Sequence, residues 1–248
     1  MFRQSLVKKT KVTQYLVYAF GEIILVVIGI LLALQINIWN EEKKNQQESK
    51  EFIGRLLNEV RINIKHAEYE IEVETNQIRS SQKILNLFNE TNGEINTVIF
   101  DSLIYITLVG NTVDINTATL VEGQNTGKIT LVKSDSLRLA LYNLPTIIEE
   151  IRKQEFLDRS DISDKLTTFL YSHYNYRNMD NSYSSHKGKI GKTHFTSFNN
   201  LDLLNSMTFE NMMDNRFYLN NLQMNDLKNL KEELQLIEKL ILKEISSD

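Results

Sequence analysis

The longest apolar stretch of the chain lies close to its N-terminus. Twelve consecutive apolar or glycine positions occupy residues 23–34, and the wider segment 16–39 contains few polar side chains. As an α-helix, segment 16–39 extends about 36 Å, more than the roughly 30 Å of hydrocarbon in a bilayer. Aromatic residues stand at its two ends, where membrane interfaces attract them: Tyr15, Tyr18 and Trp39. The pattern predicts a transmembrane helix over residues 15–40, with the lipid bilayer as its first partner.

The charges on the two sides of this span predict its orientation. The tail 1–14 carries four basic residues and no acidic one, namely Arg3, Lys8, Lys9 and Lys11. The segment 41–51 is polar with charges of both signs, as in a stalk that continues the helix. Excess positive charge stays in the cytoplasm, so we expect a cytoplasmic tail and a periplasmic domain over 52–248.

Two other structures share this order of charge and apolar residues. A cleaved signal peptide is one, but no clear small-x-small cleavage site follows Leu34. A core helix of a soluble protein is the other, and it would have to bury every face of residues 23–34. The sequence favours the membrane anchor over both.

Small and polar residues gather on one face of the predicted span. At 100° per residue, the following positions lie within about 60° of Glu22: Tyr15, Tyr18, Gly29, Ala33, Asn37 and Asn40. The opposite face carries large apolar side chains suited to lipid. A glycine and an alanine four residues apart allow two helices to approach closely. We therefore predict a helix–helix interface formed by Glu22, Gly29, Ala33 and Asn37, either in a homo-oligomer or with another envelope protein.

Glu22 allows three interpretations. It lies at the headgroup level if the span begins at residue 23, and it lies roughly 9 Å inside the boundary if the span begins at residue 16. In the second case, the carboxyl group either forms a hydrogen bond within a helix interface or relays protons, because ionisable groups inside membranes are costly without a role.

The remainder of the chain shows mainly helical periodicity. Apolar residues recur at steps of three and four from residue 53, which predicts a helix over 53–88 ended by the polar segment 89–93. They are Ile53, Leu57, Val60, Ile64, Ala67, Ile71 and Ile78. A second long helix is predicted over about 221–246, from Leu227, Leu230, Leu234, Ile237 and Ile241. One proline and nine glycines leave few helix breakers. The expected fold is all-α, an N-terminal transmembrane helix followed by a helical bundle, with packing inside one chain favoured over an intermolecular coiled coil.

The middle of the chain is less regular. Segments 98–109 and 128–133 are rich in β-branched residues, so short strands between residues 95 and 133 stay an open alternative. Residues 134–136, Ser-Asp-Ser, predict a helix start, and that helix reaches about residue 154 with Pro145 as a bend or restart. Another amphipathic segment covers 160–174, and 175–200 has the composition of a long loop.

Composition excludes several kinds of chemistry. The chain has no cysteine, and its net charge of −4 argues against a nucleic-acid binder. His173, His186 and His194 match no metal-ligand spacing. The stretch 188–193, Gly-Lys-Ile-Gly-Lys-Thr, lacks the first glycine of a phosphate-binding loop. The sequence therefore predicts no enzyme, catalytic residue, cofactor or metal.

The segment from Tyr15 to Glu42, with Gly-Glu-Ile at 21–23 and Leu-Gln-Ile-Asn-Ile-Trp-Asn-Glu-Glu at 34–42, resembles the signature of a domain-of-unknown-function family. Its members are single-pass membrane proteins common in flavobacteria and their relatives. Residues 127–138 are similar to a second recurring stretch of that family. Family members often carry Asn-Asn-Trp-Asn where this chain has Asn37-Ile38-Trp39-Asn40. The resemblance implies an inner-membrane location in a Gram-negative cell and brings no activity.

Two functional hypotheses follow. The first is a non-enzymatic inner-membrane protein whose periplasmic helices bind other envelope proteins or a second copy. The second is an accessory subunit of a proton-coupled transport or motor complex, with Glu22 as the titrating group.

Overall fold

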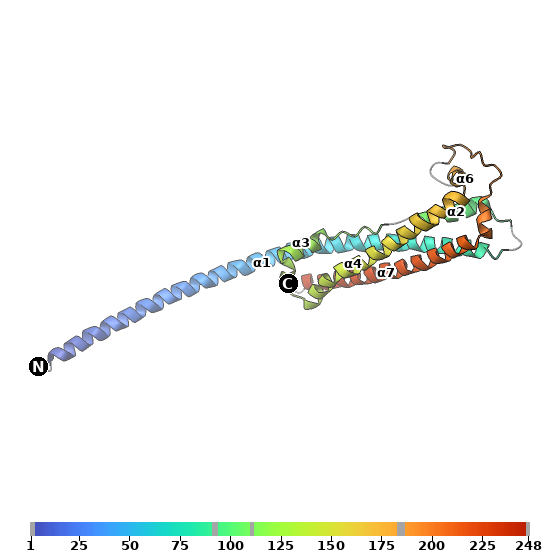
Figure 1. Ribbon diagram of the computed structural model, residues 1–248. Helices are drawn as coiled ribbons and strands as arrows, with labels where there is room; N and C mark the ends of the chain where they lie inside the picture. Colours follow the sequence, from blue (N-terminus) through green and yellow to red (C-terminus); the bar gives the residue numbers. More distant parts are fainter. Residues whose placement is uncertain (1–2, 91–93, 110–111, 183–186, 247–248) are drawn as a thin grey trace. The chain divides into compact units, whose positions relative to one another are not determined.

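The computed structural model describes residues 3–90, 94–109, 112–182 and 187–246, and all regular structure in these ranges is helical (Figure 1). The all-α prediction is therefore confirmed. The chain divides into two compact units, Met1–Phe52 and Ile53–Asp248.

The first unit consists of the N-terminal part of α1, which runs as one helix over Arg3–Leu87. It contains an apolar stretch long enough to cross a membrane, and residues 13–47 are exposed. The polar segment after the span is helical as well. It is stabilised by pairs at i, i+4, such as Lys44 with Glu48 and Gln47 with Glu51.

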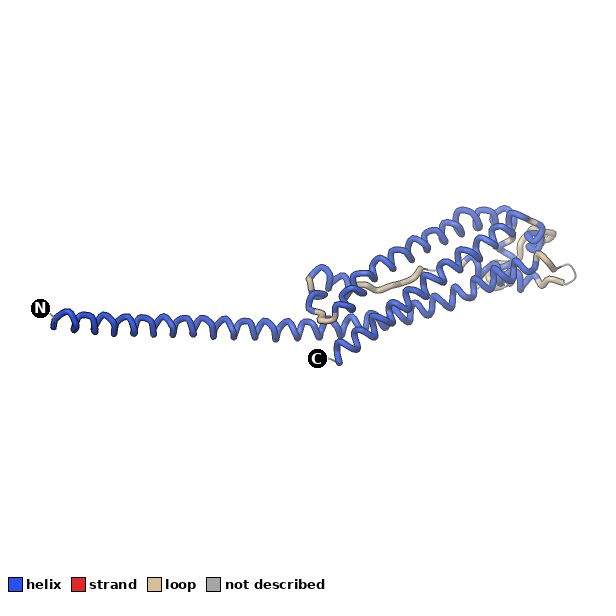
Figure 2. Tube along the Cα trace, turned by 90° about the horizontal axis from the view of Figure 1, so that it is seen from below, coloured by secondary structure: helices blue, strands red, loops and turns tan. Residues whose placement is uncertain are grey.

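The second unit is built on three long helices: residues 53–87 of α1, α4 (Asp135–Ser160) and α7 (Met207–Ser246). They run side by side in both views (Figures 1 and 2). Arg61 pairs with Glu238 at 2.7 Å, and Glu68 with Lys231 at 2.9 Å. Seven residues forward on α1 therefore correspond to seven residues backward on α7, so these two helices are antiparallel.

The core positions of all three helices follow an alternation of three and four residues. On α7, the five predicted positions 227, 230, 234, 237 and 241 are all fully buried, as the periodicity predicted. On α4, the apolar seam comprises Leu137, Leu141, Leu144, Ile148 and Ile151. These seams form an apolar core at the end of the bundle where α4 begins.

On α1 the predicted buried face is confirmed only in part, at Ile53, Val60 and Ala67. Leu57, Ile64, Ile71 and Ile78 are only half-buried. The fully buried seam is Val60, Asn63, Ala67, Glu70, Glu74, Gln77, Ser81 and Ile84. The four half-buried residues lie along the flank of this seam, because polar residues occupy much of its centre.

Helix α2 (Thr97–Leu108) occupies the segment for which a strand was considered, so that alternative is wrong. The Asn96 side chain accepts hydrogen bonds from the backbone N–H groups of Val98 and Ile99 and starts the helix. Phe100, Leu103 and Ile104 then face a buried cluster. Local capping and burial prevail over the β propensity of the segment.

The second considered strand, 128–133, is also wrong. Helix α3 (Ala118–Thr126) ends at Gly127, whose φ of +75° is readily adopted by glycine. A single 3₁₀ turn, η1 (Lys128–Leu131), follows. Ser134 then caps α4 by accepting from the Leu137 N–H, as predicted.

Helix α4 continues past Pro145 and past the predicted end near residue 154. It leads directly into a π-helical turn, η2 (Asp161–Leu166), and then into α5 (Thr167–His173). The expected amphipathic segment 160–174 is therefore largely helical.

A second apolar cluster closes the other end of the bundle. It joins Ile84, Phe100, Leu170 and Phe209 with residues of α6 (Tyr176–Ser182) and η3 (Asn200–Asn205). The predicted loop 175–200 thus contains one short helix, and its residues 183–186 lie outside the described residues. Helix α7 begins at Met207. The predicted start near residue 221 was too late, because buried polar residues interrupt the apolar pattern of the helix before that point.

Candidate functional site

The predicted helix interface lies on the exposed part of α1. Glu22, Gly29, Ala33 and Asn37 are all exposed, and a side chain added at Gly29 meets nothing within 4 Å. Because α1 is continuous, the spacing of these residues keeps them on one face. This face can accept a second helix, with close backbone approach at Gly29 and Ala33.

The predicted interfacial aromatic residues lie at both ends of the apolar stretch. Tyr15, Tyr18 and Trp39 are exposed, and the Lys43 ammonium group lies 5.6 Å from the Trp39 ring centroid. A cation over the face of an indole adds a polar contact at the expected membrane boundary.

A buried polar layer separates the two apolar cores of the second unit. It is formed where the heptad seams of three helices become polar, and we define it by these residues: Glu70, Glu74 and Gln77 of α1, Glu155 and Asp158 of α4, and Arg216, Asn220 and Gln223 of α7. Four carboxyl groups therefore share the layer with one guanidinium group. Such groups are almost never buried without partners.

Arg216 is the centre of this layer, and its side chain is 0% exposed. Both terminal nitrogens of its guanidinium group donate to the Asp158 carboxylate. Gln77 accepts from Arg216 at 3.4 Å and from the Asn220 amide at 2.7 Å. The guanidinium group thus ties α7 to both other helices.

The three glutamates of the layer, Glu70, Glu74 and Glu155, have raised pKa values. Burial and, to a smaller extent, the neighbouring Asp158 raise the pKa of Glu74 to about 8, against the lowering effect of Arg216. Burial and the charge of Glu155 raise the pKa of Glu70. Burial likewise raises the pKa of Glu155, although its carboxylate accepts the Val113 N–H. One oxygen each of Glu70 and Glu74 has no hydrogen-bond partner among the described residues. Glu74 can therefore hold a proton near neutral pH.

Sequence reasoning missed this layer. The signal was present, since residues 70, 74 and 77 and residues 216, 220 and 223 continue the heptad steps of the apolar seams. The helices were predicted from apolar positions alone, so these polar residues were not recognised as buried.

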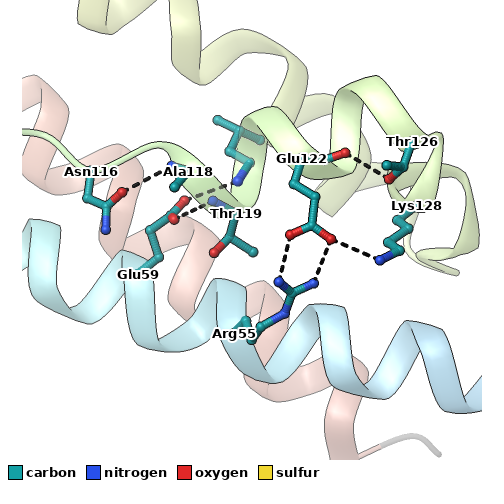
Figure 3. A network of polar contacts seen from close by, with 9 residues as sticks. Arg55, Glu59, Asn116, Ala118, Thr119, Glu122, Thr126 and Lys128 are labelled. Carbon is teal, nitrogen blue, oxygen red and sulfur yellow. Dashed lines mark hydrogen bonds and ion pairs between the residues drawn. The ribbon is translucent and has the colours of Figure 1, made fainter.

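A second polar network attaches α3 to α1 (Figure 3). The Glu59 carboxylate accepts the N–H groups of Thr119 at 2.6 Å and Leu120 at 3.1 Å, so α1 caps α3 from outside. Arg55 donates to both oxygens of Glu122 at 2.6 and 2.9 Å, and Lys128 donates at 2.9 Å. These bonds from Arg55 and Lys128 lower the pKa of Glu122 to about 2.

The three histidines considered as metal ligands are not brought together in the described part of the chain. The His173 ring stacks on Phe169 with centroids 4.2 Å apart, and its Nδ1 lies 2.9 Å from the Phe169 carbonyl oxygen. His194 is exposed, and His186 lies outside the described residues. In the described part of the chain, no three His, Asp or Glu side chains are grouped to hold a metal ion.

Among the described residues, packing alone explains neither the exposed stripe on α1 nor the buried polar layer. None of the family models, curated proteins or solved structures compared with the chain matches it.

Proposed function

We propose that the chain is a non-enzymatic, single-pass inner-membrane protein. Its helical domain lies in the periplasm and binds other envelope proteins or a second copy of itself. The observation that carries this proposal is an exposed apolar helix that has polar and small residues along one face, namely Glu22, Gly29, Ala33 and Asn37.

Two features support the anchor. The apolar stretch of α1 has none of its residues buried within the chain, so a bilayer is the natural environment for its large side chains. The basic tail before the span and the mixed charges after it favour a cytoplasmic N-terminus.

The stripe supports a partner helix. A carboxyl group and an amide exposed to hydrocarbon are costly unless they form hydrogen bonds. A second helix against Glu22 and Asn37 offers such bonds, and Gly29 and Ala33 let it approach.

Cysteine cross-linking tests the stripe, because the chain has no native cysteine. We expect Gly29→Cys and Ala33→Cys to give disulfide-linked dimers after mild oxidation of native membranes. Leu31→Cys, on the lipid-facing side, is the matched control and should stay monomeric. The products are measured as band sizes on a non-reducing gel.

A dimer-sized product at positions 29 and 33 supports self-association, and a heavier adduct there supports a different envelope partner. Monomer at all three positions, or equal cross-linking at all three, would contradict an interface on the stripe.

Substitutions of Glu22 distinguish its roles. In the Gly29→Cys background, we expect Glu22→Gln to keep most of the cross-linked product, because an amide still forms hydrogen bonds. Glu22→Leu should reduce the product several-fold. Unchanged cross-linking in both variants would place Glu22 at the headgroup level.

The relay hypothesis makes a different prediction for the same glutamine variant. A proton relay needs a titrating group, so Glu22→Gln would abolish proton-coupled function while leaving cross-linking intact. Growth of a chromosomal Glu22→Gln strain beside a deletion strain measures this. A strain carrying Glu22→Gln that behaves as wild type, where deletion has a phenotype, excludes the relay.

A further inference from the structure

An aromatic pocket opens beside α5 and α6 in the second unit. Its volume is about 460 Å³, within the usual range for small-molecule sites. Five aromatic rings line it: Tyr171, Tyr174, Tyr176, Phe195 and Phe198. The Tyr176 ring lies 5.4 Å from that of Tyr174 and 5.7 Å from that of Tyr171, centroid to centroid.

Buried hydrogen bonds hold the two walls of this pocket together. Asp101 of α2 accepts from the Tyr174 hydroxyl at 2.6 Å and from the Asn200 amide at 2.8 Å. Asn200 in turn accepts the Asn175 N–H, and the Asn175 amide donates to Thr193 at 3.1 Å. The segment that bears Phe195 and Phe198 is thereby tied to α5 and α6, so the pocket is a built feature of the fold.

Two polar groups accompany the rings. Burial raises the pKa of Tyr176 to about 12, so its hydroxyl keeps its proton. That hydroxyl lies near Thr167 but makes no hydrogen bond of normal geometry. Arg177 also lines the pocket and is exposed. The exposed Arg177 guanidinium group is the donor that an acceptor oxygen of a ligand can reach, whereas the Tyr176 hydroxyl is buried.

The segment around the pocket has a net positive charge, whereas the rest of the domain has a net negative charge. Residues 171–200 contain four basic side chains and one acidic, whereas the rest of 53–248 contains 17 basic and 26 acidic. The described basic residues here are exposed, namely Arg177, Lys187, Lys189 and Lys192. An anion is favoured here and disfavoured elsewhere on the domain.

We propose that the aromatic pocket binds an acidic saccharide. The flat faces of sugar rings stack on the exposed rings of Tyr171 and Phe195, and a carboxylate or phosphate on the sugar meets Arg177. The choice of a saccharide over a nucleotide rests on the proposed location outside the cytoplasm. The pocket itself can be tested on purified protein, independently of the cross-linking result.

Calorimetric titration of the full chain tests this proposal, in a detergent that has no sugar headgroup. The probe is trigalacturonic acid, and two molecules each lack one of its features. Galactotriose has sugar rings without charge, and citrate has three carboxylates without a sugar ring. We expect saturable binding of trigalacturonic acid, with at least about tenfold weaker binding of the other two.

Variants then locate the binding site. Phe195 is 73% exposed, so Phe195→Ala should leave the fold unchanged and weaken binding about five- to tenfold. Arg177→Gln should weaken it about tenfold. Phe156 of α4 is 66% exposed and does not line the pocket, so Phe156→Ala is the matched control, with unchanged affinity.

Absence of saturable binding by trigalacturonic acid at millimolar concentration overturns the proposal. Equal binding of citrate would mean a general basic patch, and equal binding of galactotriose would mean no selection for charge. Binding that survives both Phe195→Ala and Arg177→Gln would place the ligand elsewhere. Any of these results overturns the assignment to this pocket.

Discussion

Replacing Arg216 with methionine is expected to lower the free energy of unfolding by about 3–5 kcal/mol. The substitution keeps the apolar volume of the side chain but removes the one cation of the buried polar layer. The Asp158 carboxylate then stays buried without its partner, and Gln77 loses a donor. Urea unfolding of the full chain, followed by far-UV circular dichroism, measures the loss.

Two further variants make this result specific. Arg61→Met removes an exposed pair with Glu238, so it should cost less than about 1 kcal/mol. Adding Asp158→Leu to Arg216→Met should recover much of the loss, because no unpaired charge remains at that contact. A loss no larger than that of Arg61→Met would contradict the central role of Arg216.

The second large effect concerns pH. The pKa of Glu74 is about 8 in the folded chain and near the ordinary 4.5 in the unfolded chain. As pH rises between these values, the unfolded chain loses this proton first, so the folded state loses stability. Stability from Glu74 is therefore greatest below about pH 4.5 and declines up to about pH 8.

Glu74→Gln removes this dependence, because an amide does not titrate. When the pH rises from 5 to 8, we expect the free energy of unfolding of the wild type to fall by about 3 kcal/mol more than that of the variant. Urea unfolding at both pH values measures the difference. The histidines contribute equally to the pH dependence of both proteins, so their contribution cancels in this comparison.

Glu72→Gln is the matched control, since Glu72 is exposed on the same helix. It should follow the wild-type pH dependence. If the stability of Glu74→Gln also has the pH dependence of the wild type, Glu74 is ionised in the folded chain near neutral pH. That result would contradict the prediction that burial keeps the Glu74 carboxyl group protonated.

Features that depend on one helix were predictable from the sequence, and those that depend on how helices meet were not. The face shared by Glu22, Gly29, Ala33 and Asn37 follows from helical geometry alone. The apolar seam of α7 was predicted because its residues satisfy the same period without any partner. The start of α4 at Ser134 followed from a local cap.

The polar layer and the aromatic pocket required tertiary information. Glu74 looks like an ordinary surface residue until α7 brings Arg216 near it. Asp101 and Asn200 are far apart in the sequence, and their hydrogen bonds help to join the walls of the pocket. Segment 97–108 was ambiguous for a related reason, since burial of Phe100 and Leu103 decided for a helix against its β propensity.

The position of the polar layer along the bundle also defines which alignment of the helices is acceptable. Two apolar seams with heptad spacing tolerate sliding by one repeat, because leucine and isoleucine substitute for one another at little cost. A slip of α7 by seven residues towards the end of the bundle at Ile84 would move Arg216 away from Asp158 and Gln77 and into the apolar cluster there, at the present position of Phe209. Burial of the apolar residues therefore drives the helices together, and we expect the contacts of the buried Arg216 to select one alignment of α7 against α1 and α4.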